Sequence, residues 1–215
     1  MKKRLLSIFL AACLIFTLLP VSAFADTTAS GTCGDNLTWT LDSEGILTIS
    51  GTGDMYDYEY KKAPWFGDTE ITKIVVNSGV TSIGAYAFGG CTALKLVTLP
   101  DGVKSIGKHA FDGIDFLDIT LPNGVETIGD YAFSWSNLKT ITLPEGLKSI
   151  GDYAFYWCRY LKSIKLPESL ISIGRNAFED CSAITEIVIP DSVTSIGYFA
   201  NPKHQATCDN FHLDY

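Results

Sequence analysis

Carboxylates that recur beside prolines are the first side chains here whose types and spacing could do chemistry. They directly follow a proline in successive segments, at Asp101, Glu145, Glu168 and Asp191, with Asn123 in the same column. A glycosidase needs a carboxylate pair in a cleft, one with a raised pKa, whereas carboxylates after a turn proline are expected in solvent. Their oxygens would also suit calcium. We favour a solvated edge with no catalytic residue.

A second cluster, His204-x3-Cys208-x3-His212, would share one face of a helix and has the residue types that zinc prefers. It lies in a short terminus containing Pro202, which offers little to hold a site rigid, so we expect no metal. The sequence has no nucleophile elbow, phosphate loop or His-Glu-x-x-His motif. These observations favour a protein that is not an enzyme and needs no cofactor.

Composition excludes two kinds of partner. The 215 residues contain 16 Lys and Arg against 24 Asp and Glu, a formal net charge of −8. Binding to nucleic acid or to an anionic membrane surface depends on an excess of positive charge. With 47% hydrophobic and 19% charged residues, the chain is expected to fold.

Residues 1–25 have the pattern of a secretory signal peptide. Lys2, Lys3 and Arg4 precede an apolar run over residues 5–19, and Ala23-Phe24-Ala25 provides a cleavage site. The run is shorter than the roughly 20 residues that span a membrane, so we expect cleavage, secretion and no membrane insertion afterwards. Leu10-Ala11-Ala12-Cys13 leaves lipoprotein processing as an alternative. Cleavage after Ala25 would leave 190 residues with a formal charge of −11.

The middle of the chain repeats with a period of 22 or 23 residues. Ile-Gly pairs occur at residues 83–84, 106–107, 128–129, 150–151, 173–174 and 196–197, and Ala-Phe follows the first five at a fixed offset. Periods of 20–29 residues are typical of leucine-rich repeats. Loops without cysteine are one residue shorter: Ile114 and Ser136 stand eight residues before a proline, where Cys91, Cys158 and Cys181 stand nine before.

One unit shows why the repeats must stack. Apolar residues at strand spacing are expected to point inward and a proline then ends the strand. A second inward pair, a glycine bend and an Ala-Phe pair follow. The inward residues of one unit are Leu161, Ile164, Leu166, Leu170, Ile173, Ala177 and Phe178, and Leu138, Ile141 and Leu143 are counterparts in the unit before. Neighbouring units would bury them, with the Ile-x-Leu strands forming one parallel sheet, spaced about 4.8 Å.

This pattern resembles the BspA-like (treponemal-type) leucine-rich repeats of bacterial surface proteins, over residues 71–200. The resemblance implies a β-rich solenoid of about six coils. Residues 37–41 and 46–49 alternate at period two around a turn, which predicts a β-hairpin within a 26–70 cap. Residues 201–215 leave the pattern and are either a tail, a degenerate cap or a point of truncation.

Five cysteines remain after signal cleavage: Cys33, Cys91, Cys158, Cys181 and Cys208. Cys158 and Cys181 occupy the same place one coil apart, within reach of a disulfide. Buried thiols that pack as small hydrophobic groups are the interpretation we favour.

Two outer surfaces are candidate binding sites. The first is the outward side of the Ile-x-Leu sheet, expected to be concave, and we call it the threonine face: Thr98, Asp118, Thr120, Thr140, Thr142, Ser163, Lys165 and Glu186. Threonine at half-exposed strand positions is also a simple β-propensity choice. The alternative is a shallow surface for protein binding.

The second surface is an aromatic patch formed by Tyr131, Trp135, Tyr153 and Trp157. Other coils place Gly90, Gly113 and Asp180 at the tryptophan site, and a site that accepts such different residues is not in the core. The patch is therefore expected to be partly exposed, as a binding surface or through mutual packing of the rings.

The resemblance implies a secreted, non-enzymatic, adhesin-like protein at or near the cell surface, whose partners are extracellular proteins. A carbohydrate-binding module using the aromatic patch, and a spacer or fragment of a larger surface protein, remain alternatives.

Overall fold

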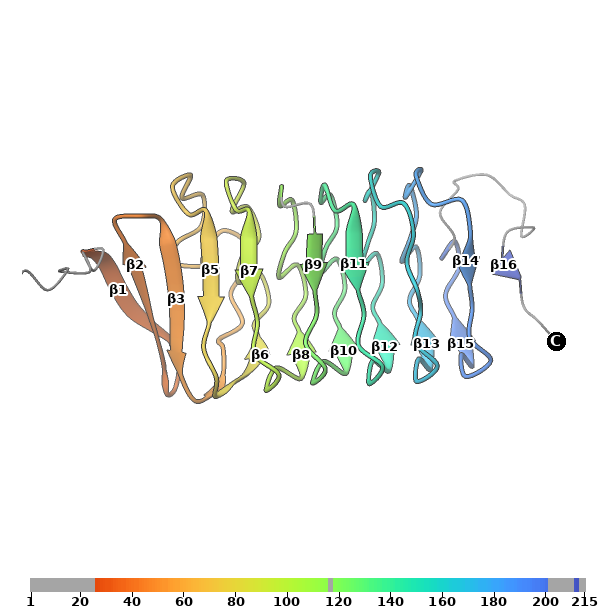
Figure 1. Ribbon diagram of the computed structural model, residues 1–215, viewed down its shortest axis with the longest axis horizontal. Helices are drawn as coiled ribbons and strands as arrows, with labels where there is room; N and C mark the ends of the chain where they lie inside the picture. Colours follow the sequence, from red (N-terminus) through yellow and green to blue (C-terminus); the bar gives the residue numbers. More distant parts are fainter. Residues whose placement is uncertain (1–25, 116–117, 201–210, 213–215) are drawn as a thin grey trace, which may run out of the picture.

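The computed structural model describes residues 26–115, 118–200 and 211–212. It is a β-solenoid whose coils stack along one long axis (Figure 1), with no helix in these three ranges. The expected solenoid of about six coils is confirmed. The predicted signal peptide and most of the C-terminal tail lie outside the described residues.

A continuous parallel sheet follows one side of the stack. Six of its strands are the Ser-Ile or Thr-Ile segments that precede the repeat glycines, where isoleucine pairs with isoleucine from coil to coil, and a short strand before the repeats pairs with the first of them. Its seven strands are β4 (Gly53–Asp54), β6 (Val80–Ile83), β8 (Ser105–Ile106), β10 (Thr127–Ile128), β12 (Ser149–Ile150), β13 (Ser172–Ile173) and β15 (Ser195–Ile196).

The Ile-x-Leu side is divided, so the prediction of one parallel sheet there is wrong. The strands β5 (Lys73–Val76) and β7 (Leu96–Thr98) pair together, as do β9 (Asp118–Thr120) with β11 (Thr140–Thr142), and β14 (Ile187–Val188) with β16 (Phe211–His212). Both edges of the β9–β11 pair coincide with a change of loop length, because only these two coils have the shorter loop. A one-residue change in loop length shifts the position at which the next strand can pair with the strand of the neighbouring coil, and so changes the register.

The core consists of the same side chains repeated in each coil. Phenylalanine rings form a fully buried column in which successive centroids are 5.4 Å apart: Phe88, Phe111, Phe133, Phe155 and Phe178. The residues predicted to point inward are all buried, which confirms that part of the interpretation.

The predicted hairpin is present. Strand β2 (Leu37–Asp42) pairs antiparallel with β3 (Ile46–Gly51), and the Asp42 carboxylate accepts the N–H groups of Glu44 and Ile46 in the turn. An additional strand, β1 (Thr27–Gly34), pairs with β2, and β3 pairs in parallel with β5 of the first coil. The antiparallel segment and the first two coils therefore share one sheet, β1-β2-β3-β5-β7.

Cysteines in the described ranges are free and fully buried. The Cys158 thiol donates to the Phe133 carbonyl at 3.1 Å, and the Cys181 thiol to the Phe155 carbonyl at 3.0 Å. The interpretation as buried thiols is confirmed for this column, and Cys158 and Cys181 are not joined by a disulfide. Burial raises the pKa of the Cys181 thiol well above its usual value.

Candidate binding surfaces

The residues assigned to the threonine face are all exposed. Thr140 and Asp118 are register partners in β11 and β9, and the Thr140 hydroxyl donates to the Asp118 carboxylate at 2.5 Å. A shallow hollow of about 350 Å³ lies where β7 and β9 fail to pair, lined by residues 96–99, 118–120 and 140. This face is therefore open and polar, with short side chains.

The proline-following carboxylates Asp101, Glu145, Glu168 and Asp191 are exposed, as expected for a solvated edge. In the part of the chain that the structure describes, no three His, Cys, Asp or Glu side chains lie close enough to hold a metal ion. The His204–Cys208–His212 cluster lies outside the described side chains. Over the same described part, no helix is long and apolar enough to cross a membrane.

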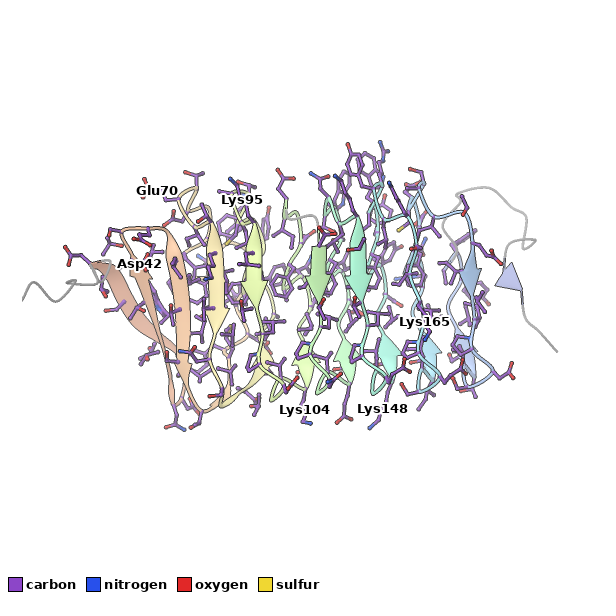
Figure 2. The ribbon with its side chains drawn as sticks, viewed as in Figure 1. Asp42, Glu70, Lys95, Lys104, Lys148 and Lys165 are labelled. Atoms are coloured by element: carbon purple, nitrogen blue, oxygen red, sulfur yellow. The ribbon has the colours of Figure 1, made fainter. Side chains whose placement is uncertain are left out.

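Opposite charges alternate along another edge of the stack, where Lys104 and Lys148 project outward (Figure 2). Lys148 forms an ion pair with Glu126, and its hydrogen bond and charge lower the pKa of that carboxyl group. Exposed pairs of this kind contribute little to stability. The edge is a solvated surface and does not resemble a binding site.

Two positions of the repeat lie in the left-handed region of φ, in six and in five coils of the described residues, and these positions build the aromatic surface. The first directly precedes the repeat alanine, with φ between 52° and 57°, at Tyr86, His109, Tyr131, Tyr153, Asn176 and Phe199. The second is the tryptophan site, with φ between 56° and 79°, at Gly90, Gly113, Trp135, Trp157 and Asp180. Glycine, and less often Asn or Asp, adopts this conformation readily. The turn accounts for the glycines of this column, and the two tryptophans adopt the same backbone conformation.

The first left-handed position carries a column of parallel rings. The centroids of Tyr86 and His109 are 4.5 Å apart, those of His109 and Tyr131 4.6 Å, and those of Tyr131 and Tyr153 4.7 Å. The guanidinium of Arg175 lies 5.4 Å from the Tyr153 centroid at the end of the column. Sequence reasoning found Tyr131 and Tyr153 but missed Tyr86 and His109, although all four stand directly before an Ala-Phe pair.

The second left-handed position carries an indole pair. Trp135 is 51% exposed and Trp157 is half-buried, and their centroids are 4.0 Å apart. The guanidinium of Arg159 lies 3.2 Å from the Trp157 centroid. Tyr156 contacts Trp135 and Tyr153 edge-on, joining the two ring columns. Partial exposure and mutual packing of the predicted patch are both confirmed. We call this surface, from Tyr86 to Trp157, the aromatic ridge.

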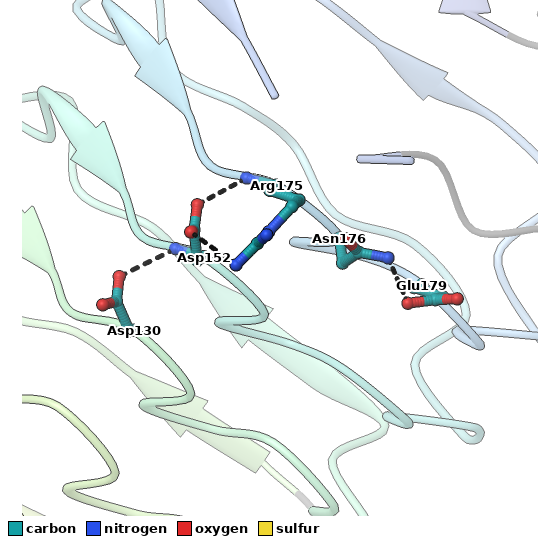
Figure 3. Close-up of polar contacts among 5 residues, drawn as sticks. All are labelled: Asp130, Asp152, Arg175, Asn176 and Glu179. Atoms are coloured by element: carbon teal, nitrogen blue, oxygen red, sulfur yellow. Dashed lines mark hydrogen bonds and ion pairs between the residues drawn. The ribbon is translucent and has the colours of Figure 1, made fainter. Parts of the chain in front are cut away.

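Carboxylates fix the backbone beside the ridge (Figure 3). The Asp130 carboxylate accepts the N–H of Asp152 at 2.9 Å, and the Asp152 carboxylate accepts the N–H of Arg175 at 2.6 Å. Asp152 also lies 3.6 Å from the Arg175 guanidinium, and the Asn176 amide donates to the Glu179 carboxylate. Each aspartate bridges two coils, so the rings lie on a preorganised support.

Comparisons with known proteins agree with this architecture. A scan of protein families matches the description "BspA type Leucine rich repeat region" in six copies, over residues 62–151 and 126–205. A search of curated proteins gave no match.

Several solved structures are similar to the chain. A leucine-rich repeat protein from Eubacterium ventriosum is 27% identical, with a TM-score of 0.46 over 79% of this chain and 68% of that one. A leucine rich cell surface protein from Faecalibacterium prausnitzii is 25% identical, with a TM-score of 0.44 over 79% of this chain and 55% of that one. The T. pallidum leucine-rich repeat protein is 20% identical, with a TM-score of 0.44 over 77% and 81%.

Proposed function

Because the chain belongs to the family of BspA-type leucine-rich repeat proteins, we propose that it acts outside the cell as a non-enzymatic, adhesin-like binding protein. Its partners would be extracellular proteins, of the host or of a neighbouring cell. The observation that carries this proposal is the aromatic ridge, since a half-exposed tryptophan stacked on a second one is costly to leave in water.

The geometry favours a protein partner over a glycan. Sugar binding uses free ring faces, but the rings of Tyr86, His109, Tyr131 and Tyr153 cover one another face to face. Trp157 is covered by Trp135 and by the Arg159 guanidinium. The ridge thus offers mainly ring edges, the half-exposed indole of Trp135 and an arginine, and Trp, Tyr and Arg are enriched at the energetic centres of protein interfaces.

The experiment compares the protein with the double variant Trp135→Ala/Trp157→Ala in pull-downs of extracellular proteins and on a glycan array. The matched control is Thr120→Ala/Thr142→Ala on the threonine face. Loss of captured proteins only in the tryptophan variant supports the proposal. Loss of glycan-array binding with retained protein capture would favour the carbohydrate-binding alternative. If the unaltered chain binds nothing in either assay, the spacer interpretation is favoured.

Secretion requires a separate test, because residues 1–25 lie outside the described structure. We expect the chain in the culture medium to begin at Asp26, as N-terminal sequencing would show. A lipid-modified Cys13, or a chain retained in the cytoplasm, would contradict the proposed location.

A further inference from the structure

A small hollow lies at the N-terminal end of the aromatic ridge, apart from the tryptophan pair. Its volume is about 170 Å³, enough for one small head group. We call it the aromatic hollow, and its lining is Tyr60, Phe66, Tyr86, Gly89, Gly90, Asp112 and Gly113. From this lining we propose that the aromatic hollow binds a methylated ammonium group of the choline type.

Three rings form its apolar wall. The Tyr60 centroid is 6.0 Å from those of both Phe66 and Tyr86, with interplanar angles of 70° and 61°. All three rings line the hollow. Aromatic faces attract cations, and several rings around one space are the usual means of binding a quaternary ammonium group.

These rings already attract a cation within the chain. The ammonium of Lys61 lies 4.9 Å from the Tyr60 centroid and 6.0 Å from that of Phe66. Lys61 is not part of the lining of the hollow. Its position shows that these ring faces are accessible to positive charge.

Asp112 supplies the opposite charge and is held in place from two sides. One carboxylate oxygen lies 3.0 Å from His109 Nδ1, and the other accepts the Ser134 hydroxyl at 2.6 Å. Each oxygen thus has one hydrogen-bond partner that holds it in place. A primary ammonium brings three N–H donors that need acceptors, whereas a methylated ammonium needs charge and apolar contact alone. The ring faces of the lining supply apolar contact and no acceptors, which favours the methylated cation.

Glycines keep the hollow open. Gly90 and Gly113 occupy the column that carries Trp135 and Trp157 further along, and a Cβ at Gly90 would lie 2.8 Å from the Phe66 ring. Open space surrounds the Cβ position of Gly113. The backbone at Gly113 has φ 68°, close to the 56° of Trp135, so a tryptophan is compatible with this turn. Gly113→Trp should therefore fill the hollow without a steric clash, with only the backbone strain that Trp135 already carries at the equivalent position.

The test is a calorimetric titration of the protein with choline chloride. The comparison ligand is the neutral isostere of choline, in which a tert-butyl group replaces trimethylammonium. We expect saturable choline binding with a Kd on the order of 1 mM, and roughly tenfold weaker binding of the isostere. Equal affinity for the two ligands, or no choline binding, would overturn the proposal.

Variants locate the site. Gly113→Trp, Tyr60→Leu and Asp112→Asn should each weaken choline binding at least about tenfold, whereas Trp135→Gly, the matched change one coil later, should leave it unchanged. Tyr60 is 60% exposed, so Tyr60→Leu keeps the test valid if Gly113→Trp does not fold. Choline binding that survives Tyr60→Leu in the folded protein would place the ligand elsewhere. Protein capture by the tryptophan pair is a separate readout, so either proposal can fail alone.

Discussion

Replacement of Phe133 by alanine is the sharpest test of how the solenoid is stabilised. Phe133 is fully buried and stacks on Phe111 and on Phe155, at 5.4 Å in both cases. Truncation of a buried phenylalanine costs about 3–5 kcal/mol through lost burial and the remaining cavity. Each aromatic pair adds about 0.5–1.5 kcal/mol beyond burial. With two pairs lost, we expect a cost of about 4–5 kcal/mol, in the upper half of that range.

Phe178 provides the matched control. It is equally buried but stacks on one phenylalanine, Phe155, at 5.4 Å. Phe178→Ala should therefore cost about 1 kcal/mol less than Phe133→Ala. Stability of a repeat stack is a sum of coil and nearest-neighbour terms. Loss of the ring at Phe133, inside the stack, should therefore split the cooperative unit, while loss of the ring at Phe178 should only fray the C-terminal coils.

The assay is urea unfolding followed by far-UV circular dichroism and by tryptophan fluorescence. Phe133→Ala should lower the midpoint strongly, and its two signals should no longer coincide. Phe178→Ala should keep the main transition and add a small one before it. If Phe133→Ala lost less than about 1 kcal/mol, or if Phe178→Ala lost as much, the phenylalanine column would not be the element that couples the coils.

Three further predictions concern the supports of the ridge, the buried thiol of Cys91 and the tryptophan pair. Asp152→Ala removes the acceptor of the Arg175 N–H and should cost about 1 kcal/mol, whereas Asp152→Asn, which keeps an oxygen, should lose less in thermal denaturation. Burial raises the pKa of the Cys91 thiol from 9.0 to about 12. The thiol of the unfolded chain therefore ionises first, so the stability that the buried thiol contributes is complete below pH 9 and is lost between about pH 9 and 12. Urea midpoints should fall less steeply over that range in Cys91→Ala, and an identical slope would contradict the assignment. Trp135 and Trp157, 4.0 Å apart, should add to the exciton signal that Trp39 and Trp65 give at 5.4 Å in far-UV circular dichroism, and either single change to phenylalanine should remove that added part.

Periodicity predicted the core well, because every coil repeats the same inward residues. Leu161, Ile164 and Phe178 are buried as expected, and alternation predicted the hairpin. The seven-stranded sheet was not predicted, since two-residue Ser-Ile strands are too short to show a period of two. The change in loop length was visible in the sequence, but its effect on strand pairing depends on three-dimensional register.

The candidate site was predicted only in part, for a reason that lies in the backbone. Interchange of glycine, tryptophan and aspartate correctly indicated exposure of Trp135 and Trp157. A column that mixes Tyr86 and His109 with other tyrosines does not stand out by residue type. It becomes a stack because all its members share a left-handed turn, and residues other than glycine seldom adopt one.

At the left-handed turns the outer residue can change without a change in the core residues of the same coil. In the tryptophan column the core on the inner side hardly changes, while the outer residue changes from glycine at Gly113 to an indole at Trp135 and Trp157 and an acid at Asp180. A glycine leaves a hollow and an indole builds a ridge on the same backbone. If this is correct, Gly113→Trp should cost no more than the roughly 1–2 kcal/mol of a left-handed backbone at a residue other than glycine, and Trp135→Gly about 1 kcal/mol or less, while each weakens a different binding activity. Large destabilisation by either change would show that the outer residue and the core are coupled.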